Sequence, residues 1–163
     1  MKVYLLRHAQ AEPGFPDAER KLTEKGCRDV EKLGALLRGK DDFRPEHTWV
    51  SPLLRAGETA SVFLQALGMA HASVQQKEEA SLEPDRDPLP LVDLLSALEE
   101  DVLLVGHNPN LEILSSLLIS GERYRSRMYL KTCSLVCLEW LPQSDHGQSG
   151  ICALRWVLDP RLI

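Results

Sequence analysis

The 163-residue sequence lacks several features that would place it in a special class of protein. It has no apolar run near the roughly 20 residues that a membrane-spanning helix needs, and Arg7 interrupts its first apolar stretch, residues 3–6. It also has no internal repeat and no low-complexity tract. These absences favour a single soluble domain over residues 1–163, which we expect in the cytoplasm and not in a membrane.

Cysteine is sparse and follows no ligand pattern. The four cysteines form neither a CxxC pair nor a zinc-type spacing with histidine: Cys27, Cys133, Cys137 and Cys152. We therefore expect free thiols that pack as small apolar side chains. The sequence predicts no metal site and no cofactor.

Positive charge is in deficit, since the formal net charge is -5. This balance argues against nucleic acid or an anionic membrane as a general partner, although a local basic pocket remains compatible with it. Hydrophobic residues make up 44% and charged residues 26%, as in ordinary globular proteins. No feature of the sequence defines an oligomeric state.

Apolar periodicity and turn residues predict strands alternating with helices. Strands are expected at residues 2–6, 47–50, 101–105, 134–140 and 152–158, with a short edge strand near 73–75. Helices are expected at residues 24–38, 52–67, 89–98 and 110–119, with Thr23 and Ser51 as N-caps of the first two. This order predicts an α/β fold, a three-layer α/β/α sandwich whose mostly parallel sheet ends in a C-terminal antiparallel hairpin.

Cationic side chains follow three of the predicted strands. Arg7 and His8 end the first strand, Arg55 comes shortly after the second, and His107 follows the strand at 101–105. Ligands of open α/β sheets bind beyond the carboxyl ends of the strands, where these residues would meet. Two guanidinium groups and two imidazoles at one edge predict a pocket for an anion, best matched by a phosphoryl group.

The segments that carry these residues resemble the histidine phosphatase superfamily, also called the phosphoglycerate mutase-like or RHG family. They are LRHA at 6–9, SPLLRAGET at 51–59 and VGHNP at 105–109. Within the superfamily the whole chain is most similar to the small SixA-like phosphohistidine phosphatases. One departure is Ala9, which stands where the family name expects glycine after the histidine.

The resemblance implies a phosphoglycerate mutase-like fold, a role in signal transduction and a role for each residue of the pocket. His8 matches the nucleophile, Arg7 and Arg55 match the arginines that hold the phosphoryl oxygens, and His107 matches a further donor to them. The chemistry agrees, because a histidine with an ordinary pKa near 6.5 is largely neutral at pH 7 and neighbouring cations lower its pKa further. Preplaced donors stabilise the charge on the phosphoryl oxygens, so this mechanism requires no metal.

The proton donor is left open by the sequence. Larger family members use an acidic residue from the interval before the second histidine, and five candidates occur here: Glu78, Glu79, Glu83, Asp85 and Asp87. Of these we single out Glu83 as a further candidate for substrate binding. The same interval, residues 68–89, is too short for the lid found in larger relatives.

Three functions remain open at this stage. A histidine leaving group, with a pKa of about 6.5, needs less protonation than an alkoxide, near ~15.7 for water, so a site without a well-placed acid favours protein phosphohistidine. The alternative substrate is a small phosphomonoester, such as a sugar or nucleotide-derived phosphate. A phosphate-binding module without catalysis is disfavoured because binding alone needs no nucleophile such as His8. Ser51 is expected to cap a helix and not to act as a nucleophile, since no GxSxG frame surrounds it.

Overall fold

A mixed six-stranded sheet forms the centre of the molecule in a computed structural model that describes residues 1–69, 75–143 and 150–162. Its strand order is β3-β2-β4-β1-β5-β6. The strands are β1 (Lys2–Arg7), β2 (His47–Val50), β3 (Gln75–Glu78), β4 (Val102–Gly106), β5 (Leu135–Trp140) and β6 (Cys152–Leu158). Strands β1 to β4 run parallel, whereas β5 is antiparallel to both β1 and β6. The predicted sheet with a C-terminal antiparallel hairpin is confirmed.

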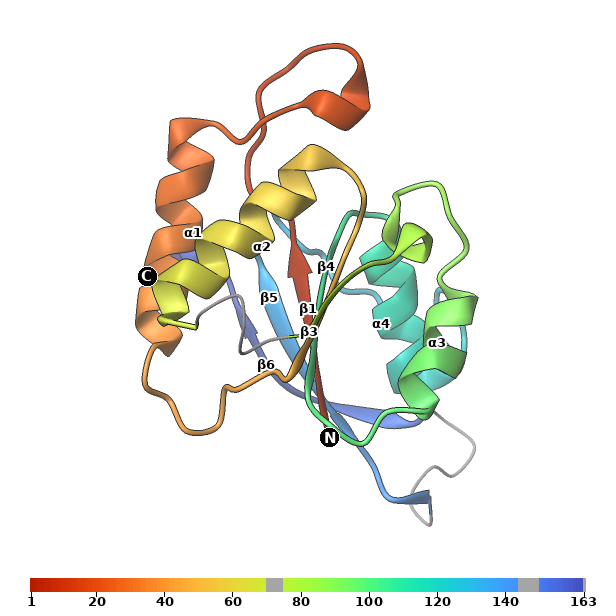
Figure 1. Ribbon diagram of the computed structural model, residues 1–163. Coiled ribbons are helices and arrows are strands. Elements are labelled where there is room, and N and C mark those ends of the chain that lie inside the picture. Colours follow the sequence, from red (N-terminus) through yellow and green to blue (C-terminus); the bar gives the residue numbers. More distant parts are fainter. Residues whose placement is uncertain (70–74, 144–149, 163) are drawn as a thin grey trace.

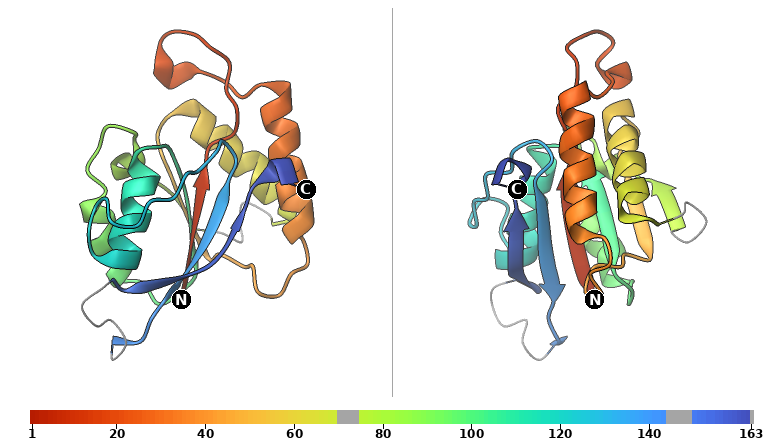
Figure 2. Two further views of the ribbon diagram at one scale, coloured as in Figure 1. Left: turned by 180° about the vertical axis from the view of Figure 1, so that it is seen from behind. Right: turned by 90° about the vertical axis from the view of Figure 1, so that its left-hand side faces the viewer.

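Helices cover both faces of this sheet (Figures 1 and 2). The helices are α1 (Glu24–Leu37), α2 (Leu54–Leu67), α3 (Leu89–Ser96) and α4 (Asn110–Ser120). Helices α1 and α2 lie on one face, and α3 and α4 lie on the other. Short 3-10 helices also occur in the described part of the chain, among them η1 (Asp17–Glu19), η3 (Ala80–Leu82) and η5 (Pro160–Leu162).

The core consists of two apolar clusters separated by the sheet. Successive residues of a strand point to opposite faces, so Tyr4 and Leu6 of β1 join the cluster under α1 and α2. Val3 and Leu5 join the cluster under α3 and α4. All four side chains have no exposed surface, which explains why the first strand is an unbroken apolar run.

Helix α1 begins as the sequence predicts. The hydroxyl of Thr23 accepts a hydrogen bond from the backbone N–H of Gly26 at 2.9 Å, which satisfies one free donor of the first turn. A side chain at Gly26 would collide with the backbone of Gln10. Glycine therefore lets the first turn of α1 pack directly against the segment that follows His8.

Some predicted boundaries are wrong. Helix α2 begins at Leu54, because Ser51 and Pro52 form a turn before it and the hydroxyl of Ser51 has a different partner. The edge strand begins at Gln75, while residues 73 and 74 lie outside the described residues, as does most of the loop between β5 and β6. Helix α3 ends at Ser96, two residues before the predicted end.

The cysteines are all free, as the sequence predicts. Among residues 1–69, 75–143 and 150–162, no cluster of three or more His, Cys, Asp or Glu side chains could hold a metal ion. No helix in the described part of the chain is both long and apolar enough to cross a membrane.

Candidate active site

The carboxyl ends of β1, β2 and β4 bring the predicted site residues together. Arg7 lies opposite Gly106 in the ladder between β1 and β4, and Val50 lies opposite Val105 in the ladder between β2 and β4. The next residues therefore emerge at the same edge of the sheet. Beyond the strands, the backbone N–H of His8 donates to the carbonyl of Gly106 at 2.9 Å, and this bond holds the two segments in place.

His8 is held as a neutral imidazole with one nitrogen available. Its Nδ1 lies 2.7 Å from the carbonyl oxygen of Ala9, and because a carbonyl only accepts, Nδ1 carries the proton. The lone pair is therefore on Nε2. Burial lowers the pKa of His8 to about 4, against the opposing hydrogen bond to Ala9, and the charges of Arg55, Arg7 and Arg20 lower it further.

His107 lies beside His8, with ring centroids 4.8 Å apart. Its side chain is almost fully buried, and its Nε2 lies 2.8 Å from the hydroxyl oxygen of Ser51. Burial lowers the pKa of His107 to about 3, with further lowering by His8 and Arg55. The prediction that Ser51 caps α2 is wrong, because Leu53 occupies the N-cap position; the Ser51 hydroxyl is a partner of His107 and also accepts from the backbone N–H of Leu53 at 3.4 Å.

Arg55 projects from the first turn of α2 and is held by a residue that the sequence analysis did not single out. One terminal nitrogen donates to the backbone carbonyl of Asp17 at 2.9 Å, and the other donates to its carboxylate at 3.1 Å. Arg20 also donates to this carboxylate, at 2.9 Å. The hydrogen bond from Arg20 and the charge and hydrogen bond of Arg55 hold the pKa of Asp17 below its usual range, against a smaller effect of burial.

Asp17 and Arg20 belong to the segment between β1 and α1, which rises above the carboxyl edge of the sheet (Figure 1). No periodicity marks this segment in the sequence. The one available signal was the sequence Asp17-Ala-Glu-Arg20, a carboxylate and a guanidinium separated by three positions in a loop after the nucleophile.

Thr59 connects the segment that contains His8 to α2. Its buried hydroxyl accepts from the backbone N–H of Ala9 at 3.1 Å and donates to the carbonyl of Arg55 at 2.6 Å. The methyl group of Ala9 is fully buried in the core cluster under α1 and α2. Alanine at this position is therefore accommodated by packing, and the backbone beside His8 keeps a fixed partner.

Arg7 is anchored on the opposite side of the site. One of its terminal nitrogens donates to the carbonyl of Leu130 at 2.6 Å, and the amide of Asn108 donates to the same oxygen at 2.9 Å. The carboxylate of Glu112 in α4 accepts from Asn108 at 2.6 Å and from the backbone of Leu130 at 3.0 Å. Burial lowers the pKa of Arg7, although nearby Glu112 opposes this effect.

Three nitrogen atoms of the site are buried and have no hydrogen-bond partner among the described residues. They are Nε of Arg7, Nε of Arg55 and Nδ1 of His107. Buried donors without partners are costly and uncommon in folded proteins. Their gathering around His8, next to two cationic guanidinium groups, gives the site the chemistry of an oxyanion pocket.

The five candidate acids are not equivalent. The carboxylate of Glu79 pairs with Lys77 at 2.8 Å, and that of Asp87 pairs with Arg123 at 2.8 Å. Although burial acts to raise the pKa of Glu79, hydrogen bonds from Lys77 and Ser81 bring it below its usual range. Both groups are therefore committed as carboxylates to partners outside the site.

Glu83 is the candidate best connected to the site. The carbonyl of the preceding residue, Leu82, lies 3.2 Å from the place that a Cβ would take at Gly106, just before His107. Asn110, in the first turn of α4, donates to the carbonyls of Ser81 and Arg86 at 2.9 Å each and holds this segment on the same edge. The Glu83 carboxylate itself lies 3.6 Å from Arg86.

The remaining two acids have less support. Glu78, the last residue of β3, is exposed and lines a hollow that also includes Ser51 and Pro52. Asp85 is exposed. In the described part of the chain, neither carboxylate forms a hydrogen bond or an ion pair with His8 or His107.

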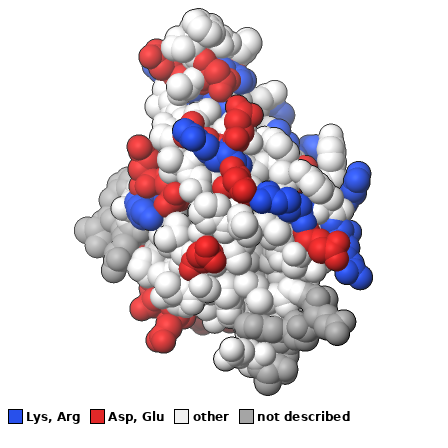
Figure 3. All heavy atoms as spheres, turned by 90° about the vertical axis from the view of Figure 1, so that its right-hand side faces the viewer, with Lys and Arg blue, Asp and Glu red and all other residues white. Residues whose placement is uncertain are grey.

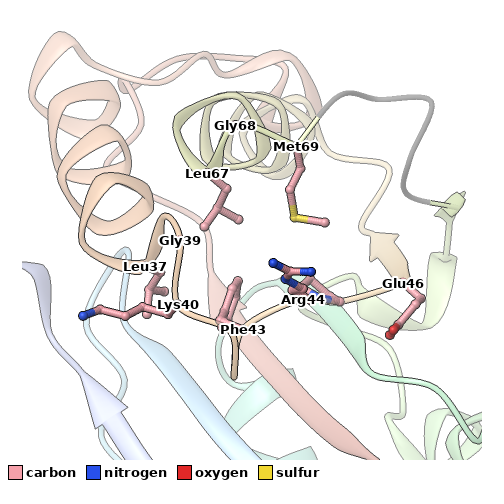
Figure 4. A pocket seen from close by; sticks show the side chains of 10 residues that line it. Leu37, Gly39, Lys40, Phe43, Arg44, Glu46, Leu67, Gly68 and Met69 are labelled. Carbon is pink, nitrogen blue, oxygen red and sulfur yellow. The ribbon is translucent and has the colours of Figure 1, made fainter.

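A separate pocket of about 390 Å³ lies where α1 and α2 end (Figure 4). Leu37, Phe43, Leu67 and Met69 contribute side chains to it. Because α1 and α2 run antiparallel to the parallel strands, their last residues lie at the opposite edge of the sheet from His8. This pocket contains none of the predicted site residues and is not part of the candidate active site.

The chain is similar to known proteins in its fold and in part of its sequence. A family model described as "Histidine phosphatase superfamily (branch 1)" matches residues 3–82. A solved structure of the protein histidine phosphatase SixA complexed with tungstate has a TM-score of 0.84 and 24% sequence identity, covering 99% of this chain and 99% of that chain. No curated protein sequence matches the chain.

Two further solved structures have similar folds. A protein provisionally described as phosphohistidine phosphatase SixA from Agrobacterium tumefaciens has a TM-score of 0.72 and 26% identity, with 98% of each chain covered. The alpha-ribazole phosphatase from Shigella flexneri has a TM-score of 0.73 and 17% identity, covering 98% of this chain and 97% of that chain. The chain is thus similar to the histidine phosphatase superfamily over residues 3–82, and it shares the SixA fold over nearly its whole length.

Proposed function

We propose that the protein is a phosphatase that hydrolyses phosphohistidine on a protein through a phosphorylated His8 intermediate. The observation that carries this proposal is the group of three buried, unpaired nitrogens of Arg7, Arg55 and His107 around a neutral His8. Pure phosphate binding would need only the donors. The free Nε2 of His8 supplies the nucleophile that turnover requires.

The reaction proceeds in two balanced steps. The lone pair of His8 Nε2 forms a bond to phosphorus while the bond from phosphorus to the substrate nitrogen breaks, and that nitrogen leaves with its electron pair and takes up a proton. A water molecule then forms a bond to phosphorus, the bond to Nε2 breaks, and inorganic phosphate leaves. The hydrogen bond from Nδ1 to the Ala9 carbonyl keeps the ring oriented in both steps.

Arg7, Arg55 and His107 stabilise the charge on the phosphoryl oxygens. The two guanidinium groups offer charge-assisted hydrogen bonds, which are shorter and stronger than neutral ones. If Ser51 donates to Nε2 of His107, the proton of that ring lies on Nδ1, the unpaired nitrogen. The SixA relative was solved with tungstate, a tetrahedral oxyanion like phosphate, which agrees with such a pocket.

The leaving group favours phosphohistidine. Glu79 and Asp87 are engaged by Lys77 and Arg123, so neither is available as a proton donor. A histidine nitrogen with a pKa of about 6.5 leaves without strong acid assistance, whereas an alkoxide does not. The relatives named as SixA phosphatases agree with this substrate class.

A second candidate is a phosphatase of small phosphomonoesters. The placement of Glu83 next to Leu82 and Gly106 favours it, because a carboxylic acid at this edge could protonate an alcohol leaving group. The alpha-ribazole phosphatase has the same fold and acts, by its name, on such a compound. Either substrate would use His8 as the nucleophile and the same arginines, Arg7 and Arg55, to hold the phosphoryl oxygens.

Trapping the intermediate tests the proposal. After mixing with labelled phosphohistidine protein and rapid quenching, the wild type should carry an acid-labile, base-stable phosphoryl group. His8→Ala should lose the label and at least about 10³-fold in kcat. His47→Ala is the matched control, because His47 lies at the start of β2 and pairs with Glu100, and it should behave as the wild type. Full activity of His8→Ala would show that the mechanism is wrong.

A substrate panel separates the candidates. We expect the highest kcat/KM on phosphohistidine protein and phosphoramidate, and lower values on phosphotyrosine and sugar phosphates. A preference for sugar phosphates would favour the phosphomonoesterase. Tight binding of inorganic phosphate with no hydrolysis of any member would instead indicate a binding module.

A further inference from the structure

A pocket beside the phosphate site has no role in the reaction described above. It has a volume of about 410 Å³, and its floor includes Pro109 and Ile113 from the start of α4. Pro109 is two residues after His107, so the pocket adjoins the second histidine along the chain. Tyr124 and Tyr129 line it from the segment that follows α4.

This segment, residues 121–131, is here called the basic rim. It is rich in positive charge although the whole chain has a net charge of -5. It contains four basic residues and one acidic residue: Arg123, Arg125, Arg127, Lys131 and Glu122. Figure 3 shows the face that carries α3 and α4, where several Lys and Arg side chains lie toward one edge with acidic and uncharged side chains among them.

Hydrogen bonds of the Leu130 backbone connect the basic rim to the catalytic site. The backbone carbonyl of Leu130, at its end, is the partner of the Arg7 guanidinium at 2.6 Å. The backbone N–H of the same residue donates to Glu112, which also lines the pocket. A molecule bound in the pocket would therefore lie next to the arginine that is proposed to hold the phosphoryl group.

Large side chains of the rim are left in solvent. Tyr124 is 65% exposed and Tyr129 is 78% exposed, next to partly buried Met128. Tyrosine, methionine and arginine are the residue types enriched at the centres of protein–protein interfaces. Arg127 is exposed and makes no ion pair with any described residue, so its charge is available to a partner.

We propose that this pocket and the basic rim dock the protein surface around the phosphohistidine, with an apolar side chain of the substrate in the pocket and its carboxylates on Arg127 and neighbouring cations. The inference rests on the proposed function and specifies its substrate as a protein region that is acidic and apolar beside the modified histidine. Charge complementarity selects this occupant, because a basic surface attracts an acidic partner and discriminates against a basic one.

Synthetic phosphohistidine peptides test the docking. One peptide carries Glu and Leu beside the phosphohistidine, a second carries Lys and Gly, and the third substrate is the free amino acid N-phosphohistidine. We expect the wild type to favour the Glu/Leu peptide over the Lys/Gly peptide by roughly tenfold in kcat/KM, the size of an ordinary hot-spot effect. Rising salt should reduce this preference, since it screens the exposed charges.

Tyr124→Ala and Arg127→Ala should each remove most of the preference and leave hydrolysis of N-phosphohistidine unchanged. Arg28→Ala is the matched control, because Arg28 is an exposed arginine of α1, on the other face of the sheet. It should retain the preference. Equal rates on both peptides, or an equal loss on the peptides and on the free amino acid, would overturn the proposal.

A binding measurement with a non-hydrolysable peptide separates the proposed docking from the proposed reaction. A labelled Glu/Leu peptide with a non-hydrolysable phosphoryl-triazole in place of phosphohistidine should bind the wild type about tenfold more tightly than it binds Tyr124→Ala. If no phosphohistidine substrate is hydrolysed but this difference persists, the proposed function is wrong and the docking stands. If N-phosphohistidine is hydrolysed and binding is independent of Tyr124 and of the flanking residues, the docking is wrong and the function stands.

Discussion

At the scale of single residues, Asp17 has the most direct influence on Arg55, one of the two arginines that are proposed to hold the phosphoryl group. Its carboxylate lies 3.1 Å from a terminal nitrogen of Arg55, where it competes with a phosphoryl oxygen for the same cation. Its backbone carbonyl binds the other terminal nitrogen and would remain after substitution of the side chain. The carboxylate therefore weakens anion binding, while the carbonyl holds the guanidinium in place.

We predict that Asp17→Asn tightens competitive inhibition by inorganic phosphate about fivefold, which corresponds to about 1 kcal/mol for a half-exposed ion pair. The inhibition constant for phosphate in a phosphoramidate assay measures this effect. Asp41→Asn removes the same charge from an exposed loop pair with Arg44 and should leave the constant unchanged. Weaker inhibition of Asp17→Asn would mean that the carboxylate positions Arg55 and does not compete.

At the scale of elements, the segment from η3 to α3 carries the acids that are candidates for proton donation. Asn110 holds the carbonyls of Ser81 and Arg86 and thereby fixes Glu83 at the edge where His107 emerges. The neighbouring Glu79 is turned away by Lys77 and by the backbone of Ser81. In this segment the Glu79 carboxylate is thus paired with Lys77, whereas the Glu83 carboxylate lies 3.6 Å from Arg86.

We predict that Glu83→Gln reduces kcat/KM on a phosphomonoester at least about tenfold and leaves hydrolysis of phosphoramidate nearly unchanged, because only the ester needs a proton on its leaving oxygen. Parallel steady-state assays of the two substrates provide the measurement. Glu79→Gln serves as the matched control and should affect neither. Equal activity of Glu83→Gln and wild type on the ester would exclude Glu83 as the proton donor.

At the scale of the whole molecule, the two buried histidines link stability to pH. The pKa values of His8 and His107 are about 4 and about 3 in the folded protein, below the ordinary value of 6.5 in an unfolded chain. Below pH 6.5 the unfolded chain therefore binds protons that the folded protein does not. This contribution to stability is complete above pH 6.5 and is lost as the pH falls toward 4 and below.

We predict that the free energy of unfolding, measured by urea titration, decreases between pH 6.5 and 4 with a limiting slope of about 1.4 kcal/mol per pH unit for each histidine. His107→Gln should reduce the slope. The carboxylates whose pKa is lowered have ordinary values of 3.8 or 4.5, so the range from pH 6.5 to 4.5 reports mainly on the histidines; they are Asp17, Glu79, Asp87, Glu100 and Asp159. A constant free energy between pH 6.5 and 4.5 would contradict the prediction.

The structural features that were predicted correctly are those that residues adjacent in the sequence define. Buried strands such as 102–106 and helix caps such as Thr23 are marked by neighbouring residues, and both were predicted. Contacts between segments far apart in the chain cannot be predicted from neighbouring residues. Asp17 binds Arg55 across 38 positions, and Ser51 binds His107 across 56, so both roles were missed.

The sequence by itself predicted the α/β fold and the gathering of Arg7, His8, Arg55 and His107 at one edge of the sheet, because the order of elements along the chain and the residues at strand ends are local properties. Only the tertiary structure decided which nitrogen of His8 is free and what holds each arginine. Those facts depend on hydrogen bonds and burial between segments far apart in the chain, such as Arg7 with Leu130 and Arg55 with Asp17. The chemical group is encoded by residue type, whereas its orientation and charge state are set by the fold around it.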